Sequence, residues 1–198
     1  MSEDALSARE IFVAGVQMHS EAIAACLPAL EAPFAAAVSL CETKLKAAGK
    51  IVLFGNGGSA ADAQHIATEL TVRFTVFRRS IPAIALTTDT STLTACANDY
   101  GFHHIFARQV EALVSDHDAV IGISTSGRSP NVLAGLRQAR DLGAATIGLT
   151  GGDGGELPSL CDALIIAPAQ VTARIQEIHI LIGHLLCEAL ERRLGYVG

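Results

Sequence analysis

The sequence predicts an α/β fold: a five-stranded parallel sheet flanked by helices on both faces, with an N-terminal helical extension. From residue 50 onward, short apolar runs of strand length alternate with helix-like stretches. These runs are almost continuously apolar, which is typical of parallel strands covered on both faces. The length of 198 residues favours one domain, because two hydrophobic cores need about 100 residues or more each. We expect a single domain over residues 1–198, with residues 1–49 as the extension and 50–198 as the core.

The extension is predicted to contain two helices. Apolar residues recur at helical spacing over Ala5–Cys26 and Phe34–Ala48, and Pro28 and Pro33 lie between these stretches. Proline inside a helix removes a backbone hydrogen bond and clashes with the preceding turn. We therefore expect a break at the prolines and a second helix that is closed by Gly49.

In the core, strands and helices are expected to alternate. The predicted strands are Lys50–Phe54, Ala83–Leu86, Ala119–Ile123, Ala145–Leu149 and Ala163–Ile166. The predicted helices are Ala60–Phe74, Thr90–Ala97, Phe102–Ser115, Asn131–Leu142, Leu157–Cys161 and Ala173–Leu194. Ligands of such sheets bind at the carboxyl ends of the strands, so the loops that follow the strands are the first place to look for a site.

Two of these loops are polar and lead directly into helices. Residues 55–59 read GNGGS and follow the first strand, and residues 124–129 read STSGRS and follow the third. The second loop has four hydroxyl side chains at the N-terminus of a helix that opens at Pro130, which suits a phosphate dianion. Neither loop has the GxxxxGK[ST] pattern of nucleotide-hydrolysing enzymes. The alternative is a pair of ordinary turns with helix caps.

Further candidate residues lie on two helices. His65 and Glu69 are four residues apart and share a helix face, which Arg73 continues. His65 suits a metal and Glu69 a metal or proton transfer, although such charges also form ordinary surface ion pairs. Gln176 and His184 are eight residues apart, about 12 Å along a helix and ~80° around it. One metal would reach both only from a bent helix or from two subunits.

The composition excludes several classes of protein. The net charge is −6 with no basic run, which predicts no nucleic-acid partner. Five scattered cysteines without a CxxC pair predict inert thiols in a reducing cytoplasm. The most apolar runs, Ala119–Ile123 and Ala163–Ala169, fall short of the about 20 residues of a membrane helix, so we expect no membrane segment. The mean hydropathy of +0.39 then indicates apolar surface that is buried between copies of the chain, on the N-terminal helices and on Ala173–Leu194.

Several motifs taken together resemble the bacterial phosphoheptose isomerases, which are SIS-domain proteins. They are GNGGS at 55–59, DAQH at 62–65 with ELT at 69–71, NDYGF at 98–102, GISTSG at 122–127 and RIQEIH at 174–179. The resemblance covers about residues 50–190 and implies the SIS fold, a flavodoxin-like or Rossmann-like three-layer sandwich. It also implies a sugar-phosphate substrate, one Zn²⁺ per subunit, and a cytoplasmic homotetramer with active sites at subunit interfaces.

The resemblance further assigns roles to residues at matching positions. The phosphate would be held by Ser124, Thr125, Ser126 and Ser129. The sugar would be lined or oriented by Asn56, Gly57, Gly58, Ser59, Arg73, Asn98, Asp99 and Gln176. The acid/base pair would be Glu69 and His184, and the zinc ligands His65, Glu69, Gln176 and His184. Some members have Asp where this chain has Ala173, so the resemblance defines the reaction class better than the sugar.

The implied reaction converts D-sedoheptulose 7-phosphate into D-glycero-D-manno-heptose 7-phosphate through a cis-enediol, as the first step of ADP- or GDP-heptose precursor synthesis. One related protein, which associates with a replication initiator, shares the fold and the serine loop but lacks counterparts of Glu69 and His184. Both residues are present here, which favours the isomerase over a binding protein. A SIS sugar-phosphate sensor would carry a DNA-binding extension, and an isomerase of another ketose phosphate stays open.

Overall fold

The computed structural model describes residues 7–197. Its centre is one sheet of five parallel strands, as predicted, and the strands follow the order β2-β1-β3-β4-β5. The strands are β1 (Ile51–Gly55), β2 (Ala83–Ala85), β3 (Ala119–Ile123), β4 (Ala145–Gly151) and β5 (Ala163–Ala167). Each predicted strand is confirmed to within two residues at either end. The continuously apolar runs identified them because all residues of β1, β3 and β4 are buried.

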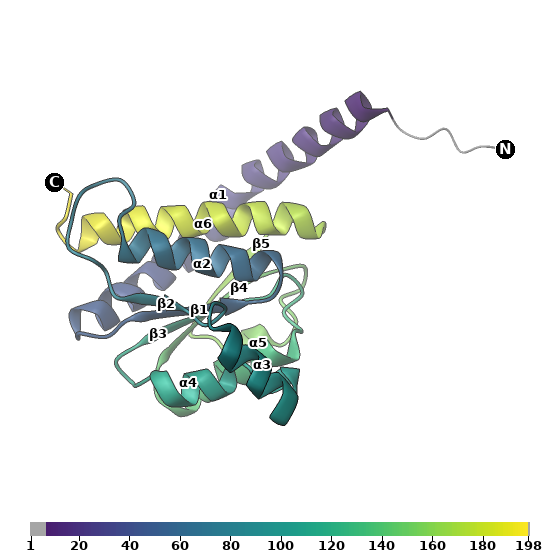
Figure 1. The fold of residues 1–198 in the computed structure, drawn as a ribbon. Helices are drawn as coiled ribbons and strands as arrows, with labels where there is room; N and C mark the ends of the chain where they lie inside the picture. The colour runs from purple at the N-terminus through teal and green to yellow at the C-terminus, as the bar shows by residue number, and fades with distance from the viewer. Residues whose placement is uncertain (1–6, 198) are drawn as a thin grey trace.

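Helices cover both faces of this sheet, so the molecule has three layers (Figure 1). The α-helices are α1 (Ala8–Lys46), α2 (Gly58–Thr71), α3 (Thr90–Asp99), α4 (Ala107–Leu113), α5 (Pro130–Asp141) and α6 (Thr172–Arg193), and the 3₁₀ turns are η1 (Phe102–His104) and η2 (Leu157–Ser159). Alternate residues of β1 face opposite layers. Ile51 and Leu53 pack with α1, α2 and α6, whereas Val52 and Phe54 pack with the layer of α3 to α5. This alternation explains why the strands are apolar throughout.

The N-terminal extension is one helix and not two. α1 runs from Ala8 to Lys46 through both Pro28 and Pro33, so the predicted break is wrong. Its second half belongs to the core, where Leu30, Ala37, Val38 and Cys41 are buried against the sheet and α6. This packing, with helix-forming Ala and Leu around the prolines, outweighs the hydrogen bonds that each proline removes. The division of the chain at residue 49 stays a prediction.

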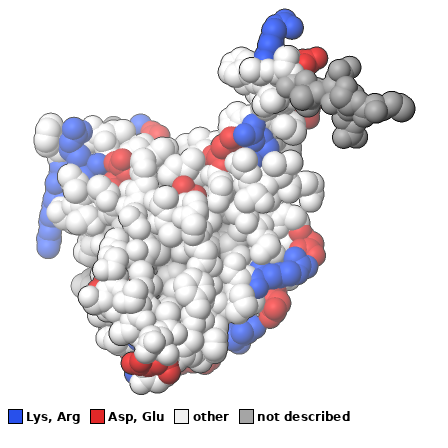
Figure 2. Space-filling model, turned by 45° about the vertical axis from the view of Figure 1, so that its right-hand side comes forward, with Lys and Arg blue, Asp and Glu red and all other residues white. Residues whose placement is uncertain are grey.

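The start of α1 projects from the body of the molecule (Figure 1). The predicted start at Ala5 lies outside the described residues. Ser7 caps the helix through a capping box with Glu10, a signal that sequence reasoning missed. Large apolar side chains on this part are exposed to solvent: Ile11, Phe12, Val13, Val16, Met18 and Leu27. Figure 2 shows a broad face beside the projection that has few charged side chains.

α1 also corrects the expectation that no segment of the chain is long and apolar enough to cross a membrane. By length and composition it could cross a membrane, because one 18-residue window has a mean hydropathy of 1.7, with 17% of that window buried. The search for uninterrupted runs missed it because Gly15, Gln17 and Ser20 interrupt the apolar residues. Between residues 11 and 30, Glu21 is the only Asp, Glu, Lys or Arg. The buried core helix of a soluble protein and a signal sequence near an N-terminus meet the same criterion.

The cysteines agree with the prediction of inert thiols. All five are free, and Cys41, Cys96 and Cys187 are buried. Burial raises the pKa of Cys41, Cys161 and Cys187 to about 12. Thiols with such pKa values stay protonated at neutral pH, so they are poor nucleophiles and poor metal ligands.

Candidate active site

The two predicted loops are neighbours at the carboxyl edge of the sheet, because β1 and β3 pair directly. Reciprocal hydrogen bonds join them. The amide of Asn56 donates to the oxygen of Asn131 over 2.9 Å, and the amide of Asn131 donates back over 2.8 Å. Asn131 is buried in the first turn of α5. Sequence reasoning missed Asn131, although its position directly after Pro130 and the serine loop was a usable signal.

The serine loop brings hydroxyl groups to the N-terminus of α5. The hydroxyl oxygens of Ser124 and Ser129 are 2.9 Å apart, and the Ser126 hydroxyl accepts a hydrogen bond from the backbone N–H of Arg128 over 3.2 Å. Ser124 is buried, Thr125 is half-buried and Ser126 is exposed. The Ser129 side chain does not cap the helix and instead lies beside the Ser124 hydroxyl. This arrangement suits a phosphate group, since hydroxyls and the helix N-terminus both favour anions.

The turn that follows β4 supports this loop. Gly127 has φ +64°, and a Cβ on it would overlap the carbonyl group of Gly154, so this position requires glycine. Arg128 forms two hydrogen bonds with Asp153, over 2.9 and 2.6 Å. Hydrogen bonding from Arg128 lowers the pKa of Asp153 to about 2. The one guanidinium group of the loop is therefore already paired, which leaves hydroxyl and amide groups to bind an anion.

Gln176 lies against the first loop. A Cβ at Gly58 would collide with the side-chain amide of Gln176, so this amide lies directly against the start of α2. Beside it, Ser59 is buried, and its backbone N–H donates to the carbonyl of Asn56 over 3.0 Å. Asn56, Gly58, Ser59 and Gln176 thus lie close together, and Gly57 lies between Asn56 and Gly58 in the same loop.

A second group forms farther along α2 and α6. The Nε2 atoms of His65 and His184 are 3.1 Å apart, and His65 Nε2 is 3.3 Å from Glu69 Oε1. The ring of Phe74 stacks on the imidazole of His184, with centroids 5.6 Å apart and planes at 21°. The chain thus brings together three of the four predicted metal ligands, which include both members of the predicted acid/base pair.

The distances in this group match those between zinc ligands. Ligands about 2.0–2.1 Å from a tetrahedral zinc are about 3.3 Å from one another, close to the 3.1 Å between His65 and His184 and the 3.3 Å between His65 and Glu69. Within residues 7–197, no group of three or more His, Cys, Asp or Glu side chains is arranged to hold a metal ion as it stands. The donor types fit zinc, and its coordination would need a further ligand or small side-chain rotations.

The loop group and the histidine group are separate within one chain. Gln176 contacts Gly58, whereas His184 contacts His65, so α2 and α6 run side by side in the same direction. Glu69 is eleven residues beyond Gly58, or about 16 Å along α2. Gln176 therefore does not join the other three predicted zinc ligands in the same chain. A straight α6 over Thr172–Arg193 removes the alternative of a bent helix.

Among residues 7–197, three other predicted site residues form no hydrogen bond or ion pair with either group. α2 ends at Thr71, so Arg73 does not continue the helix face of His65 and Glu69, and that expectation is wrong; its guanidinium lies 4.7 Å from the ring centre of Phe77. The carbonyls of Glu69 and Leu70 instead accept hydrogen bonds from Arg78, which closes the helix early. The other two residues, Asn98 and Asp99, are exposed at the end of α3. In the part of the chain that the structure describes, they bond to each other over 2.7 Å and to no other predicted site residue.

Two ionisable residues beside these groups have shifted pKa values. Burial raises the pKa of Asp62, one turn before His65, and the charge of His65 opposes this shift. Burial lowers the pKa of His179, although its Nε2 lies 2.9 Å from the carbonyl oxygen of Thr150. His179 is fully buried and is therefore part of the core, while His184 is accessible at the contact with His65.

Known proteins are similar to this chain in sequence and in fold. The SIS domain family model matches residues 16–151. A phosphoheptose isomerase from Paramagnetospirillum magneticum is 56% identical over 87% of this chain and 90% of its own length, and one from Aquifex aeolicus is 60% identical over 75% and 78%. The structure of the phosphoheptose isomerase from Neisseria gonorrhoeae superimposes with a TM-score of 0.89 at 42% identity, over 94% of this chain and all of that one. The chain therefore belongs to the phosphoheptose isomerase family of SIS-domain enzymes.

Proposed function

We propose that the enzyme isomerises D-sedoheptulose 7-phosphate to D-glycero-D-manno-heptose 7-phosphate, the first step toward an ADP- or GDP-heptose precursor. The observation that carries the proposal is the cluster of Glu69, His65 and His184, with distances of 3.1 and 3.3 Å. A protein that only binds a partner would have no need for a carboxylate held beside two imidazoles. The likeness to phosphoheptose isomerases over most of the chain supports the same choice.

The substrate phosphate would bind in the serine loop. The hydroxyls of Ser124, Thr125, Ser126 and Ser129 and the N-terminus of α5 would donate to its oxygens. The sugar would extend over the first loop, past Asn56, Ser59 and Gln176. The bonds between Asn56 and Asn131 support this model, because they hold the two loops in a constant relation while the sugar spans them.

Glu69 and His184 would carry out the proton transfers. An aldose–ketose isomerase removes a proton next to the carbonyl, passes through a cis-enediol and returns the proton to the neighbouring carbon. One of the two residues would move the carbon-bound proton and the other the proton between the oxygens. Both side chains are accessible, and each lies within 3.3 Å of His65 Nε2. Each could therefore exchange protons with a bound sugar.

His65, Glu69 and His184 would also hold a zinc ion, with Gln176 as a fourth ligand. A zinc ion bound there would polarise the carbonyl and enediolate oxygens of the sugar. Binding zinc would lower the basicity of Glu69, so its roles as ligand and as base compete. In that case the oxygen of the Glu69 carboxylate that does not bind zinc would take the proton.

Complete sites would form between subunits of a homotetramer in the cytoplasm. The separation of about 16 Å along α2 between Gly58 and Glu69 is too long for one heptose phosphate to span easily. The serine loop of one subunit would therefore face the histidine group of another, and Gln176 of the first would reach the zinc of the second. The exposed apolar residues of α1 support such an assembly, and we propose neither a nucleic-acid nor a membrane partner.

The direct test is a coupled assay of the purified protein with sedoheptulose 7-phosphate. We expect formation of the aldose, loss of activity with a chelator, and recovery with Zn²⁺. Fructose 6-phosphate serves as the control ketose phosphate, because Ala173 leaves the choice of sugar open. Turnover of the control alone would retain the isomerase and refute the heptose substrate, whereas no turnover of either would refute the proposed function.

A further inference from the structure

A buried carboxylate lies two helical turns beyond His184 on α6. The side chain of Glu191 is completely enclosed, and so is its partner Arg78, with 0% and 1% of their surfaces exposed. Glu191 accepts hydrogen bonds from the backbone N–H groups of Phe74 over 3.1 Å and Thr75 over 3.2 Å, and from the Thr75 hydroxyl over 2.6 Å. Arg78 Nε donates to it over 2.7 Å. Four donors thus tie the segment that leaves α2 to one carboxylate of α6.

The other end of Arg78 holds α2. Its two terminal nitrogens donate to the carbonyl oxygens of Leu70 over 2.8 Å and Glu69 over 2.9 Å. These carbonyls lie in the last turn of the helix, where a cation is favourable. Burial would raise the pKa of Glu191, but the hydrogen bonds from Thr75 and Arg78 outweigh it and hold the pKa below its ordinary value. The carboxylate is therefore charged at neutral pH and stays paired.

This network reaches the histidine group through Phe74. Glu191 fixes the backbone of Phe74, and the Phe74 ring stacks on the imidazole of His184. Arg78 fixes the carbonyl of Glu69, whose side chain meets His65. One ion pair thus contacts the elements that carry both members of the predicted acid/base pair, without touching either side chain.

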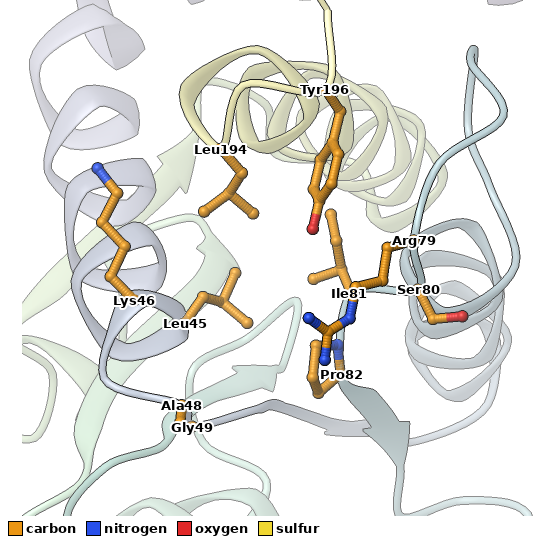
Figure 3. A pocket seen from close by; sticks show the side chains of 10 residues that line it. All are labelled: Leu45, Lys46, Ala48, Gly49, Arg79, Ser80, Ile81, Pro82, Leu194 and Tyr196. Carbon is orange, nitrogen blue, oxygen red and sulfur yellow. The ribbon is translucent and has the colours of Figure 1, made fainter.

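Beyond Arg78 the segment borders a cavity, although Ile81 is buried in the core. The residues from Arg79 to Pro82 line a cavity of about 310 Å³, together with Leu45, Leu194 and Tyr196. Figure 3 shows the side chains of Arg79 and Tyr196 directed into this space. One side of the segment therefore faces a cavity, while on the other side the backbone N–H of Ile81 donates to the carbonyl of Leu70 over 3.1 Å. The polar contacts of Arg78 and Glu191 hold the part of the segment that precedes Ile81.

We propose that Glu191 and Arg78 are positioning residues for the isomerisation: their ion pair fixes Phe74 against His184 and fixes the end of α2 that carries Glu69. This inference rests on the proposed function. A buried ion pair often adds little net stability compared with apolar side chains of similar volume. This ion pair joins α2 and α6, which each carry one member of the proposed acid/base pair. Its hydrogen bonds fix both the distance between the bonded groups and their orientation, which apolar packing would fix less well.

The activity test compares Glu191→Gln with Asp118→Asn. Asp118 is a matched control: it accepts hydrogen bonds from Lys50 Nζ, from two backbone N–H groups and from the Ser115 hydroxyl, but it contacts neither α2 nor α6. We expect Glu191→Gln to lower kcat about 10- to 100-fold with KM changed less than about twofold. Asp118→Asn should keep both constants within about twofold of the wild type. Equal losses in the two variants, or an unchanged kcat in Glu191→Gln, would overturn the proposal.

An NMR measurement tests the positioning role of Glu191 and Arg78 independently of the proposed isomerase activity. The ring current of Phe74 shifts the NMR resonances of the His184 imidazole protons, which a His184→Asn variant assigns. In Glu191→Gln these resonances should move toward their positions in Phe74→Leu, and in Asp118→Asn they should not move. The result holds whether or not the wild type turns over sedoheptulose 7-phosphate. Unmoved His184 resonances in Glu191→Gln would show that the pair does not position this residue.

If Glu191→Gln does not fold, Phe74→Leu tests whether the contact between Phe74 and His184 affects catalysis. This substitution removes the aromatic ring and leaves the backbone N–H that Glu191 binds. We expect a folded protein whose kcat is at least about threefold lower and whose KM is unchanged. Wild-type kcat in folded Phe74→Leu would contradict the link between the ion pair and His184.

Discussion

At the scale of single residues, the chain pairs side chains that are far apart in sequence. Asn56 meets Asn131, His65 meets His184, and Arg78 meets Glu191. The motif analysis found His65, Glu69, His184 and the serine loop, because each has a recognisable residue type at a definite spacing. It missed Asn131 although its position after Pro130 and the serine loop was a usable signal, and it missed Glu191 because a carboxylate on a helix has no distinctive pattern until its partner is known.

The role of Glu69 is tested by Glu69→Gln. The amide keeps the size of the side chain but can neither accept a proton at neutral pH nor serve as an anionic zinc ligand. We expect loss of measurable isomerisation with an unchanged fold and assembly, as judged by circular dichroism and size-exclusion chromatography. Glu42→Gln is the control, because Glu42 also forms ion pairs but lies on α1. Full turnover by Glu69→Gln would refute the assignment.

The serine loop is tested by Ser124→Ala and Ser126→Ala. Each change removes one hydroxyl donor to the phosphate, and a hydrogen bond to a charged group contributes about 1.5–3 kcal/mol. We expect KM to rise about 10- to 150-fold, with a smaller effect on kcat, in steady-state assays. Ser20→Ala on α1 is the control, since the Ser20 hydroxyl only donates to the carbonyl of Val16. An unchanged KM in both loop variants would show that the phosphate binds elsewhere.

At the scale of elements, strands and helix ends differ in how well they were predicted. β3 matches its predicted bounds, because a strand buried on both faces is an apolar run with polar residues at its ends. α2 ends at Thr71, three residues before the predicted end at Phe74, because Arg78 donates hydrogen bonds to carbonyl oxygens of its last turn. α1 continues through two prolines, because the sheet and α6 supply packing that local rules do not include.

The continuity of α1 leads to a prediction about Pro28. Pro28 is exposed in the helix interior, so Pro28→Ala should restore a backbone hydrogen bond and remove a clash without disturbing the core. We expect the free energy of unfolding, measured in urea, to rise by about 1–2 kcal/mol, less than the full helix cost of proline because alanine also makes the unfolded chain freer. Pro130→Ala is the control, since proline is favourable at the first position of α5. Lower stability in Pro28→Ala would indicate a broken helix in solution.

At the scale of the whole molecule, many large apolar side chains are left outside the core and exposed to solvent. The first half of α1 exposes Phe12, Val16 and Leu27, although the core of the sheet is well filled. Together with the separated loop and histidine groups, this predicts that an isolated monomer is inactive. Activity should fall on dilution in step with the loss of oligomer measured by mass photometry. A monomer that turned over substrate at the full rate would refute the shared site.

The buried charges predict how stability depends on pH. The pKa values of Asp118 and Glu191 are below their ordinary values, because hydrogen bonds outweigh the effect of burial. Each therefore stabilises the fold above its unfolded pKa, and this contribution is lost as the pH falls through the folded pKa. We expect the free energy of unfolding to decrease from about pH 5 downward, and less steeply in Glu191→Gln than in the wild type. Equal slopes would mean that Glu191 is not held as a charged group.

The sequence by itself determined the alternation of strands and helices, the two polar loops and the chemical types of the site residues. These properties follow from local patterns, since a buried strand needs apolar residues and a phosphate needs hydroxyls at a helix N-terminus. Only the tertiary structure decided that α1 is a single helix, that Gln176 lies with Gly58 while His184 lies with His65, and that Glu191 pairs with Arg78. Each of these depends on the direction in which one helix packs against another. That direction is set by contacts summed over the whole core, which no local stretch of sequence contains.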